Sequence, residues 1–151
     1  MRIFIFYVIA QLPEIDNVYR KNMLIQQTIK HWHELLNKKD PTLLKNLLDD
    51  DVVFHSPVLY TPQKGKALTT MYLSAALHVL AAKNFTYKRE VLQNNIAVLE
   101  FDALIDGIIV NGIDIIECNE KGKITDFKVM VRPLKGLQMI QQKMFQLLNN
   151  K

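Results

Sequence analysis

The apolar residues of this chain follow a helical period in some stretches and form strand-like runs in others. Apolar positions recur at steps of three and four over about residues 17–37, and Asp16 or Asn17 can cap the start of this stretch. The same spacing recurs over about 66–82 and 134–148. The pattern therefore predicts a long helix over each of these three stretches.

Apolar runs separated by turn residues follow the second of these helices. Asn94-Asn95 and Asp106-Gly107 are hairpin-turn signals, and Gly122 lies in a longer loop. These breaks predict four consecutive strands, at about 85–93, 96–105, 108–118 and 124–132. Strands joined by such short turns pair in the antiparallel direction.

Shorter elements are predicted between the first two long helices. Asp40 as cap and Pro41 at the first helical position open a short helix, which the three aspartates at 49–51 close. A strand follows over 52–56. Residues 57–65 contain two prolines and a glycine, so we expect a loop there.

The order of these elements predicts the fold class. Helices come first, then a run of strands, then a last helix, which is typical of α+β proteins. We expect a curved antiparallel sheet wrapped around the N-terminal helices, forming a cone with an apolar interior. The chain of 151 residues is long enough for one such core. We assign the domain to residues 19–151, preceded by an extension over residues 1–18.

The extension has three interpretations. Arg2 precedes the apolar run 3–10, which is shorter than a usual signal peptide and far too short to span a bilayer. The run is either an extra strand or dimer-contact segment, a truncated export signal, or part of a wrongly assigned start, with Met23 as the true first residue. Because Cys118 is the single cysteine and forms no intrachain disulfide, we expect a cytoplasmic protein, with export as the alternative.

Neither the composition nor the motifs of the chain indicate that it binds nucleic acid, a membrane or a cofactor. The net charge is +4, but the lysines are scattered and interleaved with acids, which is the pattern of a solvated surface. His31 and His33 lie two residues apart, so on a helix they point to different faces and do not form a metal pair. The sequence contains no phosphate-binding loop, dinucleotide fingerprint or zinc motif. We therefore expect no cofactor.

Two ionisable residues interrupt apolar strands and are the candidate catalytic residues. Histidine is the side chain whose unperturbed pKa of about 6.5 suits proton transfer near neutral pH, so His55 is a candidate general acid or base. Alternatively, His55 is hydrogen-bonded at the sheet rim or at a dimer contact. A buried carboxylate such as Asp114 is costly unless it is paired, hydrogen-bonded or protonated. Asp114 is either an acid or base in the cavity, or a structural carboxylate paired with Arg132 or Lys128.

Other side chains are candidates for the wall of a ligand pocket. Arg132 either binds a substrate carboxylate or forms an ion pair with Asp126 or Glu117. Trp32 is the only tryptophan and lies on the apolar stripe of the first helix, as pocket wall or as core, where its N–H needs a partner. We add three further wall candidates: Tyr60, Tyr72 and Met130.

Several of these segments together resemble a known family. The segments are 36–40, 44–53 and 55–57 in the first half, and 112–116, 122–124 and 129–133 in the second. They are similar to SnoaL-like proteins of the nuclear-transport-factor-two-like superfamily, which include polyketide cyclases and are related to ketosteroid isomerase. The resemblance covers about residues 20–148 and implies a cone-shaped, cystatin-like α+β barrel.

The resemblance also implies roles for individual residues. Ketosteroid isomerase uses a carboxylate base, and an oxyanion hole made of a tyrosine and a protonated aspartic acid. In this chain the base position is Ser56, with His55 beside it, and the tyrosine position is Trp32. The acid is retained as Asp114. Because one element of three is kept, we do not expect steroid isomerisation by that mechanism.

Three functional hypotheses follow. In the first, the cone binds a small apolar organic molecule, and His55 and Asp114 carry out cofactor-free, isomerase- or cyclase-like proton transfer. The second is a non-catalytic binding module that uses the same pocket. The third is a dimeric protein-interaction domain whose working surface is the sheet face. Whichever holds, we expect a homodimer through the sheet face, since a two-fold dimer is the usual homo-oligomer. The fold alone does not choose among them, because such folds host unrelated functions.

Overall fold

The computed structural model describes residues 2–80 and 84–149, which form four α-helices and one six-stranded sheet. The helices are α1 (Arg2–Lys38), α2 (Leu44–Leu47), α3 (Lys66–Leu80) and α4 (Leu134–Asn149), with a 3₁₀ turn at Pro41–Leu43. The strands are β1 (Leu48–His55), β2 (Gln63–Lys64), β3 (Thr86–Gln93), β4 (Ile96–Ile105), β5 (Ile108–Cys118) and β6 (Ile124–Arg132). The class is α+β, as predicted.

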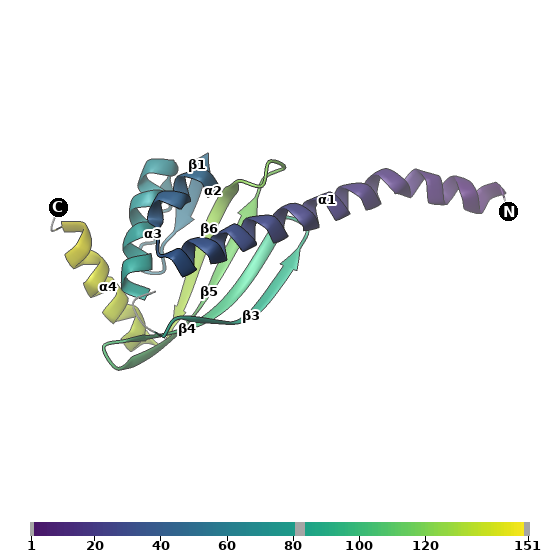
Figure 1. Ribbon diagram of the computed structural model, residues 1–151. Helices are drawn as coiled ribbons and strands as arrows, with labels where there is room; N and C mark the ends of the chain where they lie inside the picture. Colours follow the sequence, from purple (N-terminus) through teal and green to yellow (C-terminus); the bar gives the residue numbers. More distant parts are fainter. Residues whose placement is uncertain (1, 81–83, 150–151) are drawn as a thin grey trace.

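The sheet has the strand order β2-β1-β6-β5-β4-β3 and is curved but not closed (Figure 1). The consecutive strands from β3 to β6 are antiparallel, which confirms the prediction from the turns. β1, however, pairs with β6 in the parallel direction, and β2 lies in the predicted loop and pairs with β1. The curved sheet against the helices is as predicted. The predicted sheet was antiparallel and barrel-like, whereas the observed sheet is mixed and open. The parallel pair arises because no hairpin joins β1 to β6: β2, α3 and the strands β3 to β5 lie between them in the chain.

The short helical region is slightly displaced from its predicted position. Asp40 caps it as predicted, accepting a hydrogen bond from the backbone N–H of Thr42 at 3.0 Å. The aspartates at 49–51 do not close a helix, because β1 already begins at Leu48 and contains them. Leu48 is fully buried, so packing of this side chain brings the backbone into the sheet earlier than the aspartates indicate.

α1 is much longer than predicted. The helix runs unbroken from Arg2, through Pro13, and projects past β3 (Figure 1). Asp16 and Asn17 lie inside it and do not cap its start, because no glycine between residues 2 and 38 takes the chain out of the helical conformation. The extra-strand interpretation of residues 3–10 is thus wrong. The dimer-contact interpretation of residues 3–10, the domain boundary at residue 18, the export signal and the alternative start at Met23 stay predictions.

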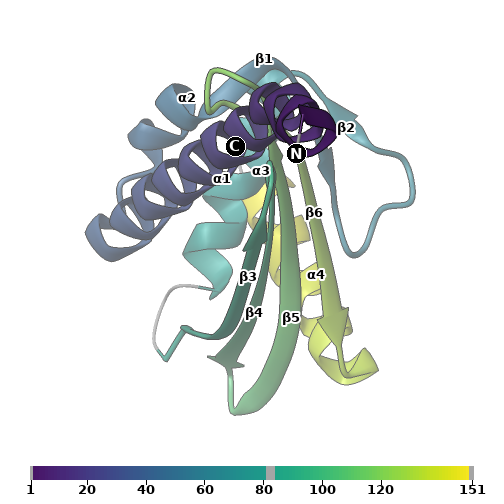
Figure 2. The ribbon, with the colours of Figure 1, turned by 90° about the vertical axis from the view of Figure 1, so that its right-hand side faces the viewer.

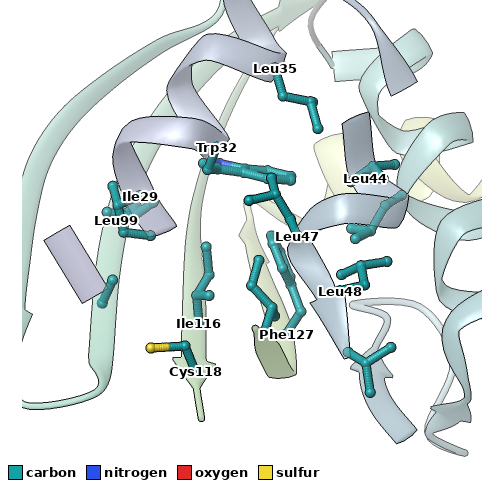
Figure 3. Close-up of a cluster of buried hydrophobic side chains, with 14 of the residues drawn as sticks. Ile29, Trp32, Leu35, Leu44, Leu47, Leu48, Leu99, Ile116, Cys118 and Phe127 are labelled. Carbon is teal, nitrogen blue, oxygen red and sulfur yellow. The ribbon is translucent and has the colours of Figure 1, made fainter. Parts of the chain in front are cut away.

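The core lies between the concave face of the sheet and the helices. α1 crosses this face, and α3 lies beside it, as two views at right angles show (Figure 1; Figure 2). Ile25, Ile29 and Trp32 of the predicted stripe are buried and pack against the inward side chains of β4, β5 and β6 (Figure 3). We call this concave face the inner face of the sheet, and the opposite one the outer face. Because side chains alternate along a strand, every second residue of each strand faces the core.

A glycine on the inner face allows the tightest contact in this core. A Cβ atom placed on Gly112 would lie 2.3 Å from Cζ of Phe101 on the neighbouring strand, so the phenyl ring occupies the space of the missing side chain. Phe101 is fully buried, and its ring stacks with that of Phe85, with the ring centroids 5.1 Å apart. Among the described residues, no helix has the length and apolar content needed to cross a membrane.

Candidate functional site

The strand period of β5 places Asp114 on the inner face of the sheet. Its neighbours on this face are Gly112 and Ile116, both buried, and Asp114 itself is 5% exposed. Val129 of β6 and Leu99 of β4 lie opposite it in the register. The carboxyl group is therefore surrounded by apolar side chains, as the sequence pattern indicated.

A chain of hydrogen bonds connects Asp114 to two aromatic side chains. The hydroxyl of Tyr87 on β3 donates to Oδ2 of Asp114 at 2.7 Å, and Nε1 of Trp32 on α1 donates to the same hydroxyl oxygen at 2.8 Å. The Tyr87 hydroxyl is thus the hydrogen-bond partner that the buried indole N–H of Trp32 needs. Trp32 also packs against Phe127, with the ring centroids 5.0 Å apart, so it belongs to the core and to the site at once.

Burial changes the acidity of both oxygen groups. It raises the pKa of Asp114 from 3.8 to about 7, and the hydrogen bond from Tyr87 opposes this shift only in part. Burial, and next the charge of Asp114, hold the pKa of the Tyr87 hydroxyl well above its ordinary value. Near neutral pH the carboxyl is therefore protonated in a large fraction of molecules. Because Oδ2 accepts the hydrogen bond from Tyr87, we expect the proton of the neutral carboxyl on Oδ1.

Asp114 does not form an ion pair with Arg132 or Lys128, the two partners predicted for a purely structural carboxylate at this position. Lys128 and Arg132 project from the outer face of β6, and Nε of Arg132 donates to Oδ1 of Asn111 at 2.8 Å. Among the described residues, only Tyr87 hydrogen-bonds to the Asp114 side chain. The carboxyl is thus neutralised by a proton and not by a cation.

The carboxyl group borders a small apolar cavity of about 30 Å³. Its wall is formed by α1, α3, β3, β5 and β6, through Trp32, Leu36, Leu73, Ala76, Leu77, Leu80, Phe85, Tyr87, Asp114, Phe127 and Val129. A space of this size holds about two water molecules. The cone is thus largely filled by its own side chains, and a larger guest needs the α3 side chains to move.

The structure does not bring His55 and Asp114 together. Phe54 is 2% exposed and faces the core, so the next residue, His55, points to the outer face. There its Nε2 lies 2.8 Å from Oδ2 of Asp126, with the two side chains 27% and 37% exposed. His55 does not line the cavity, and nor does Ser56, whose Oγ accepts from the backbone N–H of Val58.

The predicted wall residues are divided between the cavity and the surface. Of these, Trp32 lines the cavity. Tyr72 is half-buried and stacks on Phe54, with the ring centroids 5.9 Å apart, but lies outside the lining. Tyr60 is fully exposed, and Met130 is 54% exposed on the outer face. Arg132, also on the outer face, pairs with an asparagine rather than with Asp126 or Glu117.

Sequence reasoning missed Tyr87, the direct partner of the central carboxyl. One signal was available: Tyr87 is, with Phe85, one of the two aromatic residues in the predicted strand 85–93. Lys88, Arg89 and Glu90 follow it directly, so the composition of that strand gave no clear reason to point Tyr87 inward. No group of three or more histidine, cysteine or acidic side chains in the described part of the chain is arranged to hold a metal ion.

The homodimer predicted through the sheet face, the small-molecule ligand and the cytoplasmic location stay predictions. The outer face does carry exposed apolar side chains. Those most exposed are Val91 at 61%, Ile109 at 70% and Met130 at 54%. An exposed apolar surface of this kind is compatible with a partner but does not identify one.

Comparison with known proteins places the chain among others of the same fold. It is 35% identical to a steroid delta-isomerase from Pseudomonas aeruginosa, with a TM-score of 0.80 over 84% of this chain and 93% of that chain. It is 30% identical to an uncharacterised protein with a cystatin-like fold from Silicibacter pomeroyi, with a TM-score of 0.74 over 79% and 83% of the two chains. An NTF2-like protein of unknown function from Mesorhizobium loti, 15% identical over 75% and 94% of the chains, shares the fold with a TM-score of 0.66.

The family comparison agrees with these structures. No curated protein matches the sequence significantly. The family described as the SnoaL-like domain matches residues 29–127, which include the C-terminal end of α1, the whole of β1 to β5 and part of β6. The matched segment contains Trp32, Tyr87 and Asp114, and thus the whole hydrogen-bond chain at the cavity. The protein belongs to the SnoaL-like family and has the NTF2-like, cystatin-like fold.

Proposed function

We propose that this protein binds a small, largely apolar organic molecule through one oxygen atom, which accepts a hydrogen bond from the protonated carboxyl of Asp114. The observation that carries the proposal is the hydrogen-bond chain from Trp32 through Tyr87 to Oδ2 of Asp114. The chain fixes the carboxyl and leaves its proton on the other oxygen. A neutral carboxyl held in an apolar site is a strong donor to a carbonyl or enolate oxygen.

The ligand site forms when the cavity enlarges. Its present volume of about 30 Å³ is too small for a ring compound. Leu73, Leu77 and Leu80 of α3 form the side of the cavity opposite the sheet, and their side chains leave this space when α3 shifts outward. We expect such a ligand to displace these leucines, and not the sheet residues, which hydrogen bonds to neighbouring strands hold in place.

Binding is favoured over catalysis because the cavity has an acid but no second ionisable group suited to act as a base. His55 lies on the other face, and the pKa of Tyr87 is raised too far for it to serve as a base near neutral pH. Isomerase-like proton transfer is the second candidate. It is supported by the 35% identity to a steroid delta-isomerase.

A titration with ketones tests both candidates. Trp32 is the only tryptophan and lines the cavity, so its fluorescence reports occupancy. We expect saturable quenching by cyclic ketones, including the steroid androst-5-ene-3,17-dione, and an affinity that falls as the pH rises through about 7, where Asp114 loses its proton. Conjugated-enone absorbance that develops with the steroid would identify isomerase activity, whereas binding without it identifies a binding protein.

A matched pair of variants assigns the binding to the cavity. Asp114→Leu removes the donor at similar volume, and we expect it to weaken ketone binding about tenfold or more, measured by calorimetry. Asp126→Leu makes the same change on the outer face and is expected to leave binding unchanged. The proposal fails if no ketone binds, or if both variants bind as tightly as the original chain.

A further inference from the structure

A second hollow lies on the other side of α1 and shares no residue with the Asp114 cavity. It has a volume of about 390 Å³, within the range of pockets that hold small molecules. α1, α2 and the loop between β5 and β6 lie around it, side by side in both views of the molecule (Figure 1; Figure 2). We call it the α1–α2 groove. Its lining is Leu24, Gln27, Thr28, His31, Glu34, Lys38, Leu43, Asn46, Leu47, Lys121, Gly122 and Lys123.

The α1 wall of the groove follows from the sequence spacing. The residues from Leu24 to Lys38 that line it recur at steps of three or four, apart from the neighbours Gln27 and Thr28, so they form one stripe of the helix. This stripe lies beside that of Trp32, which faces the Asp114 cavity. One helix thus separates an apolar cavity from a polar groove.

The loop at the end of the groove is held in place by hydrogen bonds to both walls. Asn119 Oδ1 accepts from the backbone N–H of Lys121 at 2.9 Å and of Lys123 at 3.0 Å. The Thr28 hydroxyl donates to the carbonyl of Gly122 at 2.9 Å, and the Lys123 amine donates to the carbonyl of Asn46. The two lysines are therefore presented by a fixed loop and not by a loose one.

The charges around the groove are unbalanced. Lys38, Lys121 and Lys123 line it, against the single carboxylate of Glu34. Among the described residues, no carboxylate lies within 4.0 Å of any of these three amines. Asp40 and Asp50 attract Lys38 and Lys123 from a longer distance. The amines that line the hollow still outnumber its single carboxylate, and such an excess of positive charge attracts an anion. The leucine side chains in the same lining offer apolar contact to the rest of that molecule.

We infer that the α1–α2 groove is a binding site for a small organic anion, with its charged group at the lysines and an aliphatic part against Leu24, Leu43 and Leu47. This site is additional to the proposed ketone site, and its ligand differs in charge. Lys38 and Lys121 are the specificity-determining residues, because among the described residues their amines form neither a hydrogen bond nor an ion pair within 4.0 Å, although Lys38 is attracted to Asp40 from a longer distance.

Calorimetry with octanoate as the probe tests the inference, with octan-1-ol as the neutral probe of the same chain length. We expect octanoate to bind and to weaken as salt is added, and octan-1-ol to bind more weakly. Lys38→Met and Lys121→Met should each weaken octanoate binding about fivefold. Lys30→Met, on an exposed part of α1 outside the groove, is the matched control and should change nothing.

The site of binding is read separately from its strength. Octanoate should shift the amide resonance of Gly122 and leave Trp32 fluorescence unchanged, whereas ketones should do the reverse. The inference is overturned if octan-1-ol binds as well as octanoate, if the Lys30 variant loses as much affinity as the groove variants, or if Asp114→Leu abolishes octanoate binding. Only the last of these results would place the anion in the ketone cavity.

Discussion

Asp114 and Asp126 lie on neighbouring strands, but on opposite faces of the sheet, and they differ in every physical respect. Asp114 is buried among apolar side chains with one hydroxyl as its partner, and its pKa rises to about 7. Asp126 is 37% exposed and pairs with His55 at 2.8 Å. The comparison teaches that the direction of the strand pleat, and not the residue type, decides which carboxyl becomes a proton donor.

The largest expected effect concerns the charge of Asp114. Its pKa in the folded chain lies above the ordinary value of 3.8 that applies when the chain is unfolded, so the folded state holds the proton more tightly. The free energy of unfolding should therefore fall as the pH rises from about 4 to about 7, by up to about 4 kcal/mol. Asp114→Asn keeps the shape without the titration and should remove this loss.

Urea unfolding of both chains at a series of pH values measures the effect. Subtracting the free energy of unfolding of the original chain from that of the Asn variant cancels the contributions of all other titrating groups. This difference should be small near pH 4 and should favour the variant increasingly up to about pH 8. Asp126→Asn, on the outer face, serves as the control. If this difference in the free energy of unfolding does not change with pH, the pKa of Asp114 is not raised in the folded chain.

The second prediction compares added volume on the two faces. Gly112→Ala places a methyl group where the Phe101 ring lies, 2.3 Å from its Cζ, and should lower the free energy of unfolding by about 3 kcal/mol. Val98→Ile adds one carbon on the half-buried outer face of β4 and should change it by less than about 0.5 kcal/mol. Urea midpoints give both values, and equal costs would mean that the inner face is not tightly packed.

The separation of paired residues along the chain explains which parts of the fold could be predicted from the sequence. The hairpins from β3 to β6 were predicted correctly because their turn residues lie within a few positions of the strands that they join. The parallel pairing of β1 with β6 joins residues about 70 positions apart, such as Phe54 and Phe127. No local pattern encodes such a contact, so the sheet was predicted to be antiparallel throughout.

The candidate site was predicted in part for a similar reason. Asp114 was found because a single charge interrupts an apolar strand, a pattern visible in the sequence alone. Tyr87 was missed because charged residues follow it directly along β3, and an irregularity between Tyr87 and Arg89 breaks the alternation of that strand. His55 was predicted to be in the cavity because its sequence position does not tell which face of the sheet it takes; the burial of the neighbouring Phe54 shows that His55 points outward.

The smallest expected effect concerns His55 and is the most direct test of the comparison. His55→Gln removes a partly exposed ion pair, so it should lower the free energy of unfolding by less than about 1 kcal/mol. Because His55 does not line the cavity, ketone affinity and the pH dependence that Asp114 produces should both stay unchanged. Fluorescence titration of the variant gives the affinity, and urea unfolding gives the stability. A tenfold loss of ketone affinity at unchanged stability would instead mean that the two faces are coupled, and that His55 takes part in the chemistry of Asp114.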